Sequence, residues 1–155
     1  MGPPEGGFPA LMEALNESRI SVAAMIAGTA QAAFEAAMSY SKERIAFGKP
    51  LSKFQVNRFK LVEMGMMVEI SQLLVYKAAW LCDQKLSFAK EASMAKLYAS
   101  NAASFLTGEA VQLHGGYGYM KEYPVERCFR DAKAGTIFEG TSEIQHEIIG
   151  RLMGI

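Results

Sequence analysis

The stretch ISVAAMIAGTAQAAFEAAM, residues 20–38, repeats apolar side chains every three or four positions and contains no proline. This spacing places the apolar side chains on one face of an α-helix. The pattern continues on both sides and predicts a helix from about residue 9 to 47, with Gly48 and Pro50 as its C-terminal stop. The predicted inner face comprises Ile20, Ala24, Ala27, Ala30, Phe34 and Met38.

Two further long helices are predicted, because the apolar–polar alternation typical of strands is nearly absent. The second begins at Ser52, a suitable N-cap, and ends near Asp83. The third, from Phe88 to Leu113, is rich in alanine; small residues let helices approach closely, so we expect this helix to be central. The predicted inner face of the second helix comprises Phe59, Val62, Met66, Ile70, Leu73 and Trp80.

Shorter elements follow in the C-terminal part of the chain. Pro124 suits the first turn of a short helix over 124–132. Ser142 and Gln145 have the S-x-x-Q spacing of a capping box, so the last helix begins near Thr141 or Ser142.

Length and charge narrow the class of protein. The 155 residues suit one domain with one core, and the 16 basic and 16 acidic residues cancel. That balance excludes the broad basic surface expected of a nucleic-acid-binding or anionic-lipid-binding protein. No uninterrupted apolar run reaches the roughly 18 residues of a membrane span. Short connections between the helices predict an all-α, up-down four-helix bundle with a short extra helix over residues 9–155, after a disordered or cloning-derived segment, 1–8.

Cysteine and histidine usage predicts no metal site. Cys82 and Cys128 form no CxxC pair and are expected to be reduced thiols. His114 and His146 lie far apart, each without a second ligand at helical spacing, and are interpreted as helix-end and surface histidines.

The second helix carries apolar residues on more than one face. One core cannot bury them all, so we expect oligomerisation or docking onto another domain. The residues concerned include Met64, Met66, Met67, Leu73, Leu74 and Val75.

Two stretches have the composition of a phosphate or nucleotide site, and each is also compatible with a purely structural role. Arg44 could bind a phosphate, with Phe47 offering a flat face to a purine, or could stabilise the C-terminal helix dipole. The glycines of VQLHGGYGY, residues 111–119, could let backbone amides approach a ligand, or could cap the third helix.

Two further residues are candidates for chemistry. Glu139 precedes the last helix, where the helix dipole favours an acidic residue, so a purely structural role is possible. Ile137 and Phe138 beside it would exclude water from the carboxylate, which suits a general base. Arg19 lies just before the apolar face of the first helix, where a charged residue is normally solvated.

Four stretches in this order resemble the C-terminal helical domain of the acyl-CoA dehydrogenase family, in wording nearest to the short-chain, butyryl-CoA type. They are LNESR (15–19), ERIAFGKPLSKFQ (43–55), AVQLHGGYGYMKEYPVERCFRDAK (110–133) and IFEGTSEIQ (137–145).

The resemblance implies that an acyl-CoA thioester is dehydrogenated between its α and β carbons. A glutamate matching Glu139 removes the α proton, and the β hydrogen leaves as hydride to N5 of FAD. A minority of the family carries the base immediately before the arginine that matches Arg19; here that position is Ser18, which cannot act as a base.

The resemblance also implies binding residues. Asn16, Glu17, Ser18, Arg19 and Gly140 correspond to substrate contacts, although many relatives have aspartate where this chain has Asn16. The FAD contacts correspond to Arg44, Gln55, Gln112, Leu113, His114, Gly115, Gly116, Thr141, Ser142 and Glu143. In such enzymes several of these residues reach the FAD of a neighbouring subunit.

Family members have an N-terminal helical domain and a middle β domain before this region. We therefore expect the chain to be a fragment of a fatty-acid-metabolism enzyme, with negligible activity alone. The resemblance further implies a homotetramer built as a dimer of dimers, electron-transferring flavoprotein as electron acceptor, and a bacterial cytoplasmic or mitochondrial matrix location.

Two alternatives remain open. The chain could be a non-catalytic oligomerisation or scaffold module in which Glu139 only caps a helix. It could also belong to a related flavoprotein oxidase, although the nitroalkane type uses aspartate rather than glutamate as its base.

Overall fold

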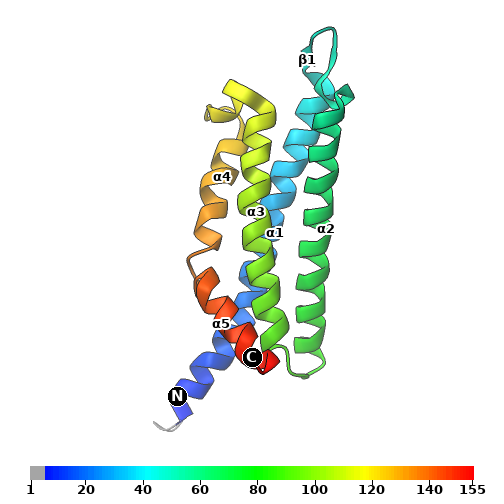
Figure 1. The fold of residues 1–155 in the computed structure, drawn as a ribbon. Coiled ribbons are helices and arrows are strands. Elements are labelled where there is room, and N and C mark those ends of the chain that lie inside the picture. The colour runs from blue at the N-terminus through cyan, green and yellow to red at the C-terminus, as the bar shows by residue number, and fades with distance from the viewer. Residues whose placement is uncertain (1–5) are drawn as a thin grey trace.

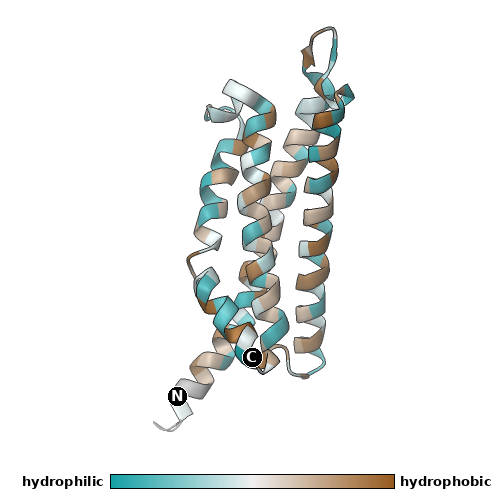
Figure 2. Cartoon of the chain, viewed as in Figure 1, coloured by the Kyte–Doolittle hydropathy of each residue, from teal (hydrophilic) through white to brown (hydrophobic). Residues whose placement is uncertain are grey.

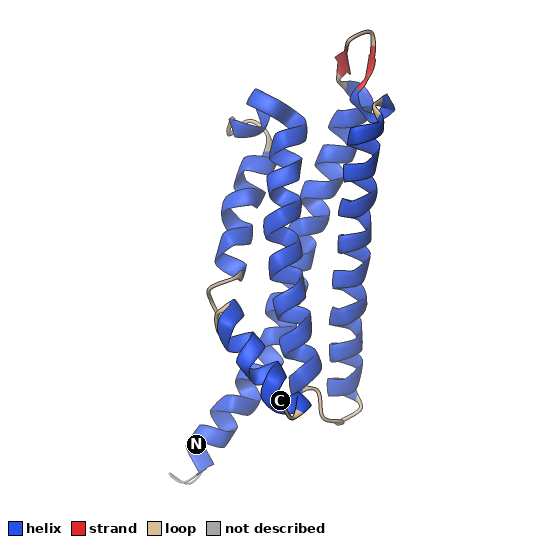
Figure 3. Cartoon of the chain, in the orientation of Figure 1, coloured by secondary structure: helices blue, strands red, loops and turns tan. Residues whose placement is uncertain are grey.

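The computed structural model describes residues 6–155 and is built from α-helices that run up, down, up and down (Figures 1 and 3). Residues 1–5 of the predicted N-terminal segment lie outside this range. The all-α bundle is confirmed, and α4 and α5 follow one another along α3 (Figure 1). The helices are α1 (Gly7–Glu43), α2 (Gln55–Asp83), α3 (Ala89–His114), α4 (Pro124–Gly135) and α5 (Ser142–Met153).

The end of α1 differs from the sequence prediction of a helix reaching residue 47. The helix ends at Glu43, and β1 (Ile45–Ala46) pairs antiparallel with β2 (Lys49–Pro50). Phe47 and Gly48 form the two-residue turn, with φ of 50° and 79°. Such turns need positive φ at both positions and match the twist of the strands they join. Gly48 therefore closes a hairpin and does not stop the helix.

The start of α2 also differs, because a short 3-10 helix, η2 (Leu51–Lys53), precedes it. Ser52 lies inside η2 and does not cap α2. The N-cap residue is Phe54, which makes no side-chain capping hydrogen bond.

Alanines line the contact between α1 and α3. The alanines that predicted a central third helix are all buried. Helix α3 contacts α1, α2, α4 and α5, which confirms its central position. On α1, Ala27 and Ala30 are buried as predicted, whereas Ala24 is exposed. The buried alanines of α3 are Ala92, Ala95, Ala99, Ala102, Ala103 and Ala110, and those of α1 are Ala23, Ala27, Ala30, Ala33 and Ala37.

The predicted inner face of α2 was wrong, because those six residues form its exposed side. Phe59 is 59% exposed, Met66 58% and Trp80 57%. Hydrophobic positions recur along the whole of α2 (Figure 2), so its periodicity fits more than one face. The face packed on α1 and α3 instead comprises Leu61, Met64, Val68, Ser71, Val75 and Ala78.

Helix α1 is long and apolar enough to cross a bilayer by length and composition alone. The sequence contains no uninterrupted apolar run of that length, because Thr29, Gln31 and Glu35 stand among the apolar residues of α1. In this fold, α1 packs against α2, α3 and α4, as the core helix of a bundle does.

Two methionines on opposite faces of α2 test this orientation. Met64→Ala removes a fully buried side chain and should lower the free energy of unfolding by about 2–5 kcal/mol. Met66→Ala, the matched control, truncates an exposed side chain and should change it by less than about 0.5 kcal/mol. Urea unfolding of the 155-residue chain at low concentration measures both, and equal losses would contradict the assigned face.

Candidate active site

Glu139 lies in the turn that separates α4 from α5, and both it and Gly140 have left-handed backbone conformations. Their φ angles are 55° and 92°. A non-glycine residue in this region costs about 1–2 kcal/mol, so surrounding contacts must maintain the conformation of Glu139. The φ of Gly140 favours glycine, and a Cβ there would also displace Nε2 of Gln145, which it would approach to 2.7 Å.

The carboxylate of Glu139 faces α1. The Ser18 hydroxyl donates to Oε2 of Glu139 at 2.9 Å, which joins residues 121 positions apart in the chain. Glu139 is half-buried, and Phe138 packs against the core while Ile137 is 57% exposed. Of the two apolar neighbours noted in the sequence, Phe138 therefore shields this turn more than Ile137 does.

Arg19 is 5% exposed, which corrects the expectation of a solvated side chain. Its Nη1 donates to Oδ1 of Asn16 at 2.5 Å, and its Nε is buried without a hydrogen-bond partner among the described residues. Burial lowers the pKa of Arg19, and the nearby Glu139 carboxylate opposes that change. Asn16, Ser18 and Arg19 thus lie near one another, whereas Glu17 is exposed.

Two side chains outside the predicted set of site residues contact the Glu139 turn. Lys96 of α3 is fully buried, and its Nζ donates to the Gly140 carbonyl at 2.6 Å. Gln145 of α5 donates from Nε2 to the carbonyls of Glu139 and Gly140, each at 3.1 Å. Burial lowers the pKa of Lys96, as does the charge of Arg19, whereas Glu139 and Glu143 raise it.

The start of α5 differs from the predicted capping box. Thr141 is the N-cap and its hydroxyl accepts from the Ile144 amide at 3.5 Å. The Ser142 hydroxyl is buried without a partner among the described residues, and Gln145 bonds the preceding turn instead. Glu143 is exposed, and hydrogen bonds from its own backbone amide and the Thr141 hydroxyl lower its pKa.

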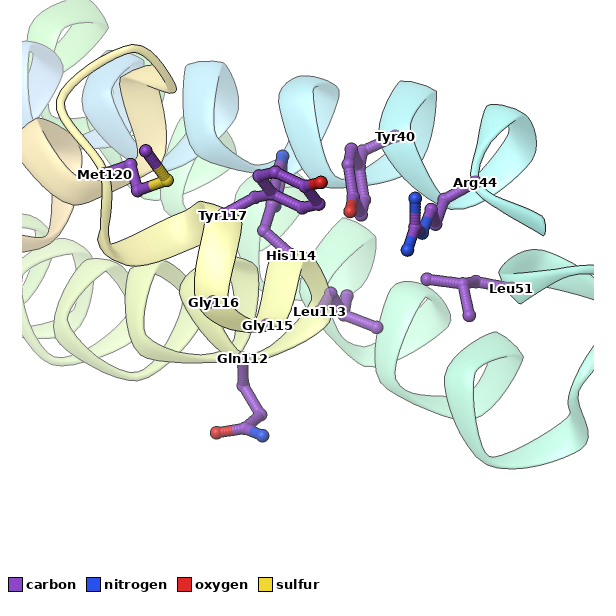
Figure 4. Close-up of a pocket in the computed structure, with 10 residues that line it drawn as sticks. All are labelled: Tyr40, Arg44, Leu51, Gln112, Leu113, His114, Gly115, Gly116, Tyr117 and Met120. Atoms are coloured by element: carbon purple, nitrogen blue, oxygen red, sulfur yellow. The ribbon is translucent and has the colours of Figure 1, made fainter. Parts of the chain in front are cut away.

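A second set of predicted site residues lines a cavity of about 550 Å³ where α1 and α3 end (Figure 4). The Tyr40 and His114 rings stack with centroids 4.2 Å apart, and the Arg44 guanidinium lies 5.6 Å from the Tyr117 ring centroid. Gln112 points away from these rings in this view (Figure 4). The lining comprises Tyr40, Arg44, Leu51, Gln112, Leu113, His114, Gly115, Gly116, Tyr117 and Met120.

His114 is the last residue of α3, in agreement with its interpretation as a helix-end histidine, but its side chain is buried. His146 is exposed at the surface. The Nδ1–H group of His114 donates to the Ala110 carbonyl at 2.8 Å, which places the proton of the neutral ring on Nδ1. Burial lowers the pKa of His114 below 6.5, against a smaller opposing effect of this hydrogen bond.

The predicted cofactor residues fall into two separate groups. Arg44 and the residues from Gln112 to Gly116 line the cavity, whereas Thr141, Ser142 and Glu143 start α5 beside Glu139. Ser18, which touches Glu139, lies in the first third of α1, whereas Arg44 directly follows its last residue. The helical rise per residue places these two positions about 39 Å apart.

Two predicted cofactor residues do not line the cavity. Phe47 is 95% exposed in the hairpin turn, and Gln55 is exposed at the start of α2. Within residues 6–155 no group of three or more His, Cys, Asp or Glu side chains could hold a metal ion.

Residues 5–154 match the family described as "Acyl-CoA dehydrogenase, C-terminal domain", and the chain belongs to this family. It is 48% identical to the mitochondrial short-chain specific acyl-CoA dehydrogenase of Bos taurus, over 96% of this chain and 36% of that protein. It is 45% identical to the caffeyl-CoA reductase–Etf complex subunit CarC of Acetobacterium woodii, over 99% of this chain and 40% of that protein.

Among solved structures, butyryl-CoA dehydrogenase from Megasphaera elsdenii matches with a TM-score of 0.98 and 47% identity, over 99% of this chain and 40% of that one. The resemblance to the short-chain type is thereby confirmed. The chain spans about 40% of the length of these relatives.

The burial of His114 predicts a pH-dependent stability. The pKa of His114 is lower in the folded protein than in the unfolded chain. As pH falls through about 6.5, His114 is therefore protonated in the unfolded chain before it is protonated in the folded protein, so the free energy of unfolding should fall. His114→Phe retains an aromatic ring against Tyr40 and should flatten this slope, which is at most about 1.4 kcal/mol per pH unit. Urea unfolding between pH 8 and 5 (about three units) measures the difference; equal slopes would contradict it.

Proposed function

We propose that this domain supplies the catalytic base of an FAD-dependent acyl-CoA dehydrogenase. Glu139 removes the α proton of an acyl-CoA thioester, and the product is a 2,3-enoyl-CoA. When bound, FAD supplies the hydride-accepting chemistry, while the protein supplies position and electrostatics. Similarity to butyryl-CoA and short-chain enzymes favours a short acyl chain.

The contact between Ser18 and Glu139 is the observation that carries this proposal. It places a carboxylate against α1 at Ser18, in a turn whose backbone is left-handed and partly shielded from water. The Ser18 hydroxyl orients one carboxylate oxygen and leaves the other, Oε1, for the substrate. Arg19 adds a buried cation whose own pKa is sensitive to the charge of this carboxylate.

The residues at the other end of the bundle fit a flavin dinucleotide. The cavity combines an exposed guanidinium with aromatic rings and with Gly115, whose φ of 61° suits a glycine. Arg44 would hold a phosphate by charge-assisted hydrogen bonds, and Gly115 and Gly116 would let backbone amides approach.

The distance between the two groups supports an FAD site built from more than one copy of the chain. About 39 Å along α1 separates Arg44 from Ser18, which contacts the turn that precedes α5 of the same chain. We propose that residues from two chains complete each FAD site, with Thr141–Glu143 from one and the Arg44 cavity from the other.

The exposed face of α2 offers a surface for such assembly. It forms a continuous apolar stripe, and large exposed apolar patches mark interaction sites. We infer a homotetramer built as a dimer of dimers that buries this stripe. Its residues are Val56, Phe59, Val62, Met66, Ile70, Leu73, Tyr76 and Trp80, which are 38–68% exposed.

The electron acceptor proposed for the reduced cofactor is an electron-transferring flavoprotein. Support comes from the similarity to the Acetobacterium woodii protein, which is a subunit of a reductase–Etf complex. The location remains proposed as bacterial cytoplasm or mitochondrial matrix.

Glu139→Gln in the full-length protein tests the catalytic role. The amide cannot accept the α proton, so kcat should fall at least about 10²–10⁴-fold while FAD content is unchanged. The measurement is steady-state turnover of butyryl-CoA with a dye acceptor, alongside the flavin absorbance of the purified protein. Glu35→Gln, which alters an exposed acid on α1 outside the predicted site residues, is the control; near-normal turnover by Glu139→Gln would favour a scaffold module instead.

Charges placed on the α2 stripe test the assembly. Met66→Asp with Leu73→Asp in the full-length protein should reduce the mass measured by light scattering, because the charges would have to be desolvated at an apolar interface. Glu35→Gln, an exposed change on α1, should leave the mass unchanged. An unaltered mass in the double variant would place the interface elsewhere.

A further inference from the structure

The underside of the Glu139 turn is held by donors from two different helices. The backbone carbonyls of Glu139 and Gly140, the two residues with positive φ, both accept hydrogen bonds. The Gly140 carbonyl accepts from Lys96 and Gln145, and the Glu139 carbonyl accepts from Gln145. Lys96 and Gln145 are each fully buried, and they belong to α3 and α5. These four residues therefore link the central helix, the turn and the final helix in one hydrogen-bonded group.

A lysine ammonium is an unfavourable group to bury, since burial removes its hydration and its charge must be compensated. Helix α3 is otherwise lined here by alanine and serine, so the close packing of this helix does not by itself explain a lysine. The cost is offset by a charge-assisted hydrogen bond to a carbonyl of the turn that carries Glu139. The side-chain amide of Gln145 is likewise committed, because two carbonyl acceptors fix its nitrogen toward the turn.

We propose that Lys96 and Gln145 are positioning residues for the base, which keep the backbone of Glu139 and Gly140 left-handed and thereby direct the carboxylate toward Ser18. This inference rests on the proposed role of Glu139. Neither residue touches the carboxylate of Glu139 through a hydrogen bond; both act on the carbonyls of its turn. Without these donors the turn can relax toward negative φ, which would swing the carboxylate away from α1.

The experiment compares Lys96→Met and Gln145→Met with wild type in the full-length, FAD-loaded protein. Each substitution keeps an unbranched side chain of similar length but removes the donor. The substrate analogue is (methylthio)acetyl-CoA, in which sulfur replaces the β carbon. Its α proton can leave to Glu139 and be replaced by deuterium from D₂O, but no β hydride can follow. Mass spectrometry of the analogue therefore reads proton abstraction alone.

We expect each variant to exchange the α proton about 100-fold more slowly, since a displacement of about 1 Å at a reacting group has that effect. With butyryl-CoA, kcat should fall similarly while KM changes little. Leu106→Ala is the control for general loosening, because Leu106 is fully buried on the same helix but more than two turns from Lys96. It should lower the melting temperature and leave exchange at the wild-type rate.

The outcomes separate this inference from the proposed function. Wild-type exchange in both Met variants, with exchange abolished in Glu139→Gln, would overturn the positioning role and leave Glu139 as the base. Wild-type exchange in Glu139→Gln would instead overturn the proposed function. Exchange that falls equally in Leu106→Ala would also overturn the inference, since the effect would then be general. If Lys96→Met does not fold, the exchange rate of Gln145→Met alone decides whether the positioning role holds.

Discussion

The close approach of α1 and α3 is the constraint on which the other contacts depend. Alanines from both helices meet in one core cluster, with Ala30, Ala33 and Ala37 on α1 and Ala99 and Ala103 on α3. Small side chains let the two backbones come near, and the larger residues of α2 and α4 then fill the remaining space. Because α3 lies at the centre, it contacts both the Glu139 turn and the cavity where α3 ends. Helix α1 reaches the same two places through Ser18 and Tyr40.

The break between α4 and α5 gives this bundle its candidate chemistry. A continuous helix along α3 would bury its inner side chains and satisfy its own backbone groups. The turn from Thr136 to Thr141 instead frees carbonyls at Glu139 and Gly140, which must find partners elsewhere. Lys96 and Gln145 provide them, and the carboxylate projects toward α1. The break between α4 and α5 thus allows the Glu139 side chain to contact α1.

The sequence was sufficient for the fold class and the central place of α3, because alanine recurring at helical spacing is typical of a helix packed closely on its neighbours. It was insufficient for the inner face of α2, where apolar residues cover two sides and only the neighbours decide which is buried. The hairpin at Phe47 was missed because phenylalanine does not predict a positive φ. Lys96 was missed because its acceptor lies 44 positions later, although a lysine among Ala92, Ala95 and Ala99 is a signal that could have been used.

Charge balance explains why polar groups accumulate at this one place in an alanine-rich core. Arg19 and Lys96 are both buried cations and disfavour one another, so neither would be stable there without a compensating anion. Glu139 opposes the effect of burial on both, and Glu143 adds to its effect on Lys96. The carboxylate proposed as the base therefore also offsets part of the cost of burying two nearby cations. One of them, Lys96, holds the turn that carries the carboxylate, so changes to this group should affect stability and proton transfer together.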